Sequence, residues 1–98
     1  MRFEEKRLRI EVHAYDRYCQ RVEPIGRAEL LEQVQSFIRD GDVRREDDCV
    51  RIGDVWWIYW TNDETVTLTT CYGRMLYDLP AALRWQRANK DRIKLIAK

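Results

Sequence analysis

The sequence predicts an α+β fold, with N-terminal helices packed on a three- to four-stranded antiparallel sheet and a further C-terminal helix. Apolar residues recur at helical spacing between residues 13 and 40. β-Branched and aromatic residues dominate residues 49–72, and Asp78 followed by Pro80 marks the start of a late helix. The 98 residues fit a single domain, residues 1–98, with one modest core.

Composition and cysteine content predict a cytoplasmic globular protein. Hydrophobic residues make up 45% and charged residues 36% of the chain, which excludes a disordered composition. The longest apolar run, Val55 to Trp60, is too short to span a bilayer, so no membrane partner is expected. The charged first residues predict no secretion signal. Three cysteines without a CxxC pair favour reduced thiols that pack as small apolar residues.

The N-terminal half contains two predicted helices. Residues 1–11 alternate loosely, and their periodicity does not decide between a strand and a lead-in to a helix. Residues 13–22 form the first helix, which Pro24 terminates. Residues 26–40 form the second, with Gly41 as its C-terminal cap. The apolar side of the first helix carries Ala14, Tyr15, Tyr18, Cys19 and Val22.

Three strands form a predicted meander over residues 49–52, 55–61 and 64–72, with turns at Gly53-Asp54 and Asn62-Asp63. Alternation places Trp56 and Trp60 on one face of the sheet, and if both faces are apolar, helices or a partner chain must cover both. In the third strand, one face is predicted to carry Val66, Leu68, Thr70 and Tyr72, and the other Thr65, Thr67, Thr69 and Cys71.

The C-terminal part is predicted to contain a helix capped by Asp78 and then a terminal strand over residues 92–98. Its basic side chains could contact phosphates, or could simply complement the dipole of the helix. The candidate nucleic-acid-binding residues are Arg84, Arg87, Lys90, Arg92 and Lys94.

The first helix carries His13, Arg17 and Arg21 at successive four-residue intervals, apart from its apolar side. Histidine can exchange a proton near neutral pH, and arginine can hold a phosphate through paired donors. Cleavage of RNA without a metal needs a base, an acid and cations around the phosphate. The stripe therefore indicates a candidate ribonuclease site, although a solvated surface histidine is the alternative.

The stretch HAYDRYCQR resembles the His-Ala-x-x-Arg-x-x-x-Arg helix that opens small phage- and prophage-associated proteins of the barnase–EndoU–colicin–RelE (BECR) class of ribonuclease toxins. RIGDVWWIYWTNDETVTLTTCY is similar to the antiparallel sheet of that class, in which a Thr, Ser or Tyr near a strand end faces the helix. The resemblance covers roughly residues 12–72. It implies His13, Arg17 and Arg21 on the helix, and Thr67, Thr69 or Tyr72 on the third strand, as site residues.

These observations predict a metal-independent ribonuclease or toxin-like RNA-binding protein, with RNA and a cognate antitoxin or other protein as partners. Its catalytic set would be His13, Arg17, Arg21, Thr69 and Tyr72, and no cofactor or metal is expected. The alternative is a non-catalytic phage or mobile-element module that binds a partner, or itself as a homo-oligomer, through its aromatic sheet. No P-loop, GxGxxG or Gly-x-Ser-x-Gly motif supports a nucleotide-binding or serine-hydrolase function.

Overall fold

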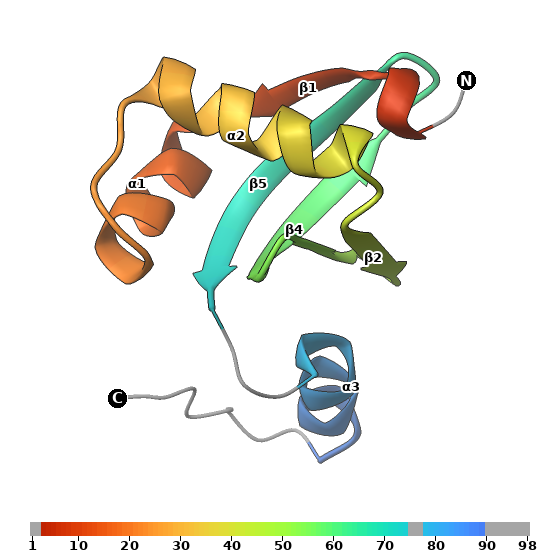
Figure 1. Cartoon of the computed structure of the whole chain (residues 1–98). Coiled ribbons are helices and arrows are strands. Elements are labelled where there is room, and N and C mark those ends of the chain that lie inside the picture. The colour runs from red at the N-terminus through yellow and green to blue at the C-terminus, as the bar shows by residue number, and fades with distance from the viewer. Residues whose placement is uncertain (1–2, 75–77, 90–98) are drawn as a thin grey trace.

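A five-stranded mixed sheet has helices on both of its faces (Figure 1). The computed structural model describes residues 3–74 and 78–89. Within these ranges, no helix combines the length and apolar character that a bilayer span requires. The elements, in order, are the 3-10 helix η1 (Phe3–Glu5), β1 (Arg7–Ile10), α1 (Val12–Arg21), α2 (Arg27–Arg39), β2 (Val43–Glu46), β3 (Cys49–Ile52), β4 (Val55–Thr61), β5 (Thr65–Gly73) and α3 (Leu79–Asn89).

The predicted α+β class is confirmed, but the number and direction of its strands are corrected. The sheet order is β1-β5-β4-β3-β2, with β1 parallel to β5 and the other neighbouring strands antiparallel. β1 lies in the stretch that periodicity leaves undecided, and pairing with β5 makes it a strand. The sequence does not predict β2, because this edge strand is half exposed and mainly charged.

A register shift between β4 and β5 changes which β5 side chains face α1 and α2. Ile58 pairs with Thr70, whereas the next β4 residue pairs with Leu68, so β5 contains one extra residue at this point, and a second register shift lies between Trp56 and Trp57. Such a bulge reverses the alternation of side chains, which a strict two-residue period cannot anticipate. The predicted faces are therefore wrong beyond Leu68, because Cys71 joins Val66 and Leu68 in the core under α1 and α2, whereas Tyr72 packs with the cluster on the opposite face.

Two apolar clusters lie on opposite faces of the sheet. In the larger cluster, Trp57 stacks on Tyr18 of α1 with the ring centroids 5.7 Å apart. The smaller cluster joins Trp56 and Cys49 to Leu79 of α3. Because Trp56 and Trp57 are neighbours on β4, their side chains point to opposite faces. Both faces are apolar at this point, and helices cover both, which is one of the two arrangements that the sequence predicts.

Helix α3 begins where the sequence predicts. Asp78 accepts a hydrogen bond from the N–H of Ala81 at 3.4 Å, and Pro80 lies in the first turn, where a missing N–H costs nothing. Arg44 of β2 also donates to the Asp78 carboxylate, at 2.8 Å. This hydrogen bond lowers the pKa of Asp78, because it favours the ionised carboxylate. The predicted terminal strand over residues 92–98 lies outside the described residues.

Candidate nucleic-acid interface

Helix α1 runs beside the second half of β5, beyond the point where β1 ends. The N–H of Glu11, which precedes α1, donates to the carbonyl of Leu68 at 3.1 Å and so continues the β1–β5 pairing. At the other end of the helix, a Cβ on Gly73 would lie only 3.2 Å from the Cβ of Arg21. The helix and the strand therefore run in the same direction, and the last turn of α1 lies against the end of β5.

Arg21 occupies this junction between α1 and β5. Its Nη1 donates to the carbonyl oxygen of Cys71 at 2.7 Å, and its guanidinium carbon lies 5.8 Å from the centroid of the Tyr72 ring. A guanidinium has five N–H donors, so one hydrogen bond leaves others for a ligand. The structure thus brings two of the predicted catalytic residues, Arg21 and Tyr72, into contact.

The other two predicted helix residues extend the site along α1. Arg17 lies one turn before Arg21 and donates to Oε1 of Gln20 at 2.9 Å. His13 lies a further turn away and is exposed. At a rise of 1.5 Å per residue, His13 and Arg21 are about 12 Å apart along the helix axis. The predicted stripe is therefore an elongated row and does not converge on one point.

The two threonines that the sequence nominates on β5 differ from Tyr72 in their surroundings. The Thr69 hydroxyl donates to the carbonyl of Ile58 at 3.2 Å, within the bulge. Thr67 is only 1% exposed, and its hydroxyl has no hydrogen-bond partner among the described residues. Thr67 is too deeply buried to touch a substrate, so Tyr72 is the strand residue best placed beside the arginines.

The predicted basic residues of α3 are engaged in ion pairs. Arg84 Nη1 lies 2.7 Å from a Glu46 carboxylate oxygen and 2.9 Å from one of Asp47. Arg87 lies 3.8 Å from a carboxylate oxygen of Asp48. These carboxylates compete with any phosphate for the guanidiniums. The other predicted nucleic-acid-binding residues, Lys90, Arg92 and Lys94, lie outside the described residues.

The alternative function, binding of a partner through the aromatic sheet, requires a flat patch of exposed tryptophans. Trp56 and Trp57 are only 3% and 1% exposed, because they belong to the two cores. Trp60 and Trp85 are 49% and 53% exposed. The longest aromatic run in the sequence therefore contributes mainly to stability, and the exposed tryptophans lie on separate elements, β4 and α3.

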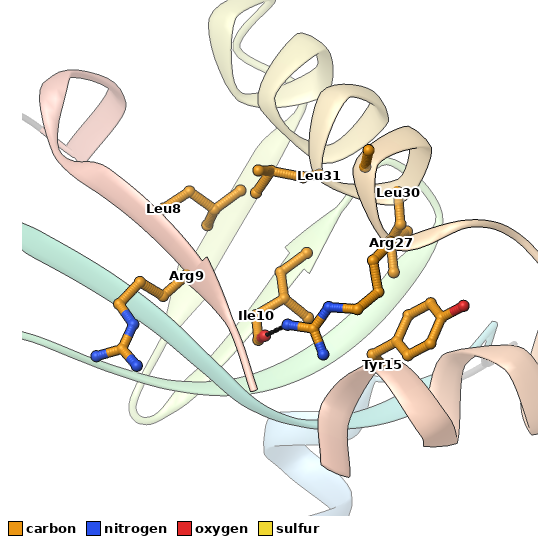
Figure 2. A pocket seen from close by; sticks show the side chains of 8 residues that line it. Leu8, Arg9, Ile10, Tyr15, Arg27, Leu30 and Leu31 are labelled. Atoms are coloured by element: carbon orange, nitrogen blue, oxygen red, sulfur yellow. Dashed lines mark hydrogen bonds between the residues drawn. The ribbon is translucent and has the colours of Figure 1, made fainter. Parts of the chain in front are cut away.

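A groove that the sequence does not predict lies between β1, α1 and the start of α2, as Figure 2 shows. Its volume is about 390 Å³. Arg27 donates from Nη2 to the carbonyl of Ile10 at 2.7 Å, and its guanidinium carbon lies 5.3 Å from the centroid of the Tyr15 ring. In the sequence, only the alternation of Leu8, Arg9 and Ile10 hints at a strand here. The pairing with β5 makes this segment an edge strand. We call this feature the β1 groove; it is lined by Leu8, Arg9, Ile10, Tyr15, Arg27, Ala28, Leu30 and Leu31.

The cysteines pack as small apolar residues where they are buried. Burial raises the pKa of both Cys49 and Cys71 to about 12, so these thiols stay protonated at neutral pH. All three cysteines are free thiols. Within residues 3–74 and 78–89, no group of three or more His, Cys, Asp or Glu side chains is arranged to hold a metal ion.

Comparison with known proteins adds no relative to this description. No protein-family model, curated protein or solved structure matches the chain. The fold and the arrangement of side chains therefore carry the functional argument by themselves.

Proposed function

We propose that this protein is a metal-independent, toxin-like ribonuclease, or an RNA-binding relative of one, that holds RNA along α1. The contact of Arg21 with both Cys71 and Tyr72 carries the proposal. The main-chain carbonyl of Cys71 fixes the guanidinium at 2.7 Å, and the Tyr72 ring packs 5.8 Å from it. A cation that is already held in place loses little freedom when it binds a phosphate.

The elongated row of side chains suits a polymer better than a small anion. Arg17 and Arg21 are one turn apart, or about 6 Å along the helix axis, so each can contact a different phosphate of one strand. His13 continues the row by one more turn and is exposed to a bound strand. A single phosphate could not contact all three side chains, whereas successive nucleotides of a single-stranded RNA could.

The chemistry that we propose uses the 2′-hydroxyl of RNA as the nucleophile. His13 accepts the proton of this hydroxyl, and the 2′-oxygen attacks the adjacent phosphorus while the bond from phosphorus to the 5′-oxygen breaks. Arg17, one turn from His13, stabilises the extra charge on the oxygens of this phosphate, and Arg21 holds the phosphate of a neighbouring nucleotide. The chain has one histidine, so the proton for the leaving 5′-oxygen comes from Asp16 or water, while Tyr72 packs beside Arg21 at the neighbouring phosphate. The products are a 2′,3′-cyclic phosphate and a 5′-hydroxyl.

The test is cleavage of a labelled single-stranded RNA in EDTA. The wild type should produce 2′,3′-cyclic phosphate ends, and His13→Ala should lower the rate by roughly a hundredfold or more, as loss of a proton-transfer group does. Arg17→Ala and Arg21→Ala should lower both the rate and the affinity. Arg39→Ala, which removes an exposed arginine from the far end of α2, is the matched control and should leave both unchanged.

Binding measurements separate the enzyme from a non-catalytic relative. If Arg17 and Arg21 each contact one phosphate, each alanine variant should reduce the slope of log affinity against log salt concentration by about 0.7. If the RNA stays intact but binds with this salt dependence, the protein binds RNA and does not cleave it. RNA that neither binds nor is cleaved, or an Arg39→Ala variant as defective as Arg21→Ala, would refute the proposal.

A further inference from the structure

The open edge of β1 presents main-chain hydrogen-bonding groups beside the β1 groove. The N–H groups of Arg7 and Glu11 donate to carbonyls of Glu64 and Leu68 at 2.8 and 3.1 Å, so these residues direct their main chain toward β5. Main-chain direction alternates along a strand, and therefore Leu8 and Ile10 direct theirs away from β5. β1 is the last strand in the sheet order, and no described strand pairs with this side.

The side chains around this edge form an apolar groove with a cation at one end. Leu8 and Ile10 are nearly buried and face the helices, and Leu31 of α2 stands opposite Leu8 (Figure 2). Arg27 reaches from α2 to the end of the strand and closes the groove there. The exposed Arg9 of β1 points to the other face of the sheet, and so adds a positive charge near the same edge.

We propose that β1 receives an extended, acidic segment of a partner protein, which adds to the sheet as a further strand. Main-chain hydrogen bonds to both groups of Leu8 and to the N–H of Ile10, whose carbonyl already accepts from Arg27, would supply affinity, and one apolar side chain of the segment would enter the groove. The volume of about 390 Å³ is within the range of sites that hold a ligand group.

Charge decides which segment fits. The residues that line the β1 groove include two arginines, Arg9 and Arg27, and no carboxylate. Neither arginine forms an ion pair with another described residue. A carboxylate on the incoming segment would pair with the remaining donors of Arg27. The same two arginines oppose pairing of β1 with a second copy of itself, because that arrangement brings like charges together.

The test uses a short fluorescent peptide that carries a valine and, two residues later on the same face, an aspartate, with a peptide that has lysine in place of the aspartate as its charge-reversed counterpart. The full chain should bind the acidic peptide and not the basic one. Arg27→Glu should weaken binding by about tenfold or more, because an attractive pair becomes a repulsive one. Arg39→Glu makes the same charge change at the far end of α2 and should bind as the wild type does.

Amide hydrogen exchange locates the peptide independently of any variant. Peptide binding should slow exchange at Leu8 and Ile10 and leave Arg9, whose amide already faces β5, unchanged. Binding that is insensitive to Arg27→Glu, or protection elsewhere on the molecule, would overturn the proposal. Protection of Leu8 and Ile10 that rises with protein concentration in the absence of peptide would also overturn it, because it would indicate a second copy of the chain. Protection of the same amides by RNA would overturn it as well. The result is distinct from RNA cleavage, because Arg27 has no part in the proposed ribonuclease row.

Discussion

Gly73 positions the candidate site, because it allows Arg21 of α1 to approach the end of β5. Gly73 has a φ of +87°, a conformation that residues with a side chain rarely adopt. The main chain of Arg21 also approaches it, with the carbonyl oxygen 3.6 Å from the place a Cβ would occupy. Glycine therefore permits both the positive φ at the end of β5 and the approach of α1, which places the Arg21 guanidinium on the carbonyl of Cys71.

At the residue scale, we predict that Gly73→Ala destabilises the protein by about 1–3 kcal/mol, through backbone strain and the new contact with Arg21. Gly41→Ala is the matched control, because Gly41 has a φ of +80° but no atom within 4 Å of its Cβ position. The Gly41→Ala variant should lose only the stability that backbone strain removes, about 1 kcal/mol. Urea unfolding of the three proteins measures the difference. Equal losses in both variants would show that the close approach of α1 carries no energetic weight.

At the element scale, α3 is held by one buried apolar residue and several exposed ion pairs. Leu79 is fully buried against Trp56 and Cys49. Arg84 and its two carboxylate partners are each about a third to a half exposed. Solvent screening makes exposed ion pairs weak, whereas burial of a leucine stabilises a helix strongly. The ion pairs consequently set the orientation of α3 on the sheet more than its stability.

We therefore predict that Leu79→Ala costs about 2–4 kcal/mol and that Arg84→Ala costs less than about 1 kcal/mol. Urea unfolding followed by circular dichroism measures both losses. Tryptophan fluorescence gives a second readout, because Trp56 packs directly against Leu79 in the same cluster. Comparable losses in the two variants would mean that the ion pairs, and not apolar packing, hold α3 in place.

Local patterns predict most elements of this fold, and long-range pairing determines the rest. The helices α1 and α2 and the strands β3 and β4 follow from apolar spacing and turn residues, with boundaries shifted by at most one residue. The bulge in β5 moves Cys71 into the core, and nothing in the local alternation signals it. In the candidate site, the stripe from His13 to Arg21 is visible in sequence, whereas the contact of Arg21 with Tyr72 depends on how α1 packs along β5.

At the scale of the whole molecule, charge is distributed unevenly although its formal sum is only +1. Arg44, Arg51, Arg74, Arg84 and Arg87 form ion pairs with carboxylates. Arg17 and Arg21, in contrast, pair with no carboxylate among residues 3–74 and 78–89. A protein this close to neutrality attracts RNA weakly at long range, so any recognition depends on such uncompensated arginines in a defined place.

The global stability of the protein should fall as the pH rises above about 9, the region where free thiols ionise. Burial raises the pKa of Cys49 and of Cys71 to about 12 in the folded protein. In the unfolded chain these thiols ionise near their ordinary pKa of about 8.5, so between these values the unfolded state binds fewer protons. A raised folded pKa gives stability that is complete below the unfolded pKa and is lost as the pH rises. Urea unfolding under reducing conditions, from about pH 7 to about pH 10, measures this slope, which Cys71→Ala should flatten. A free energy of unfolding that stays constant or increases over this range would contradict the burial of the two thiols.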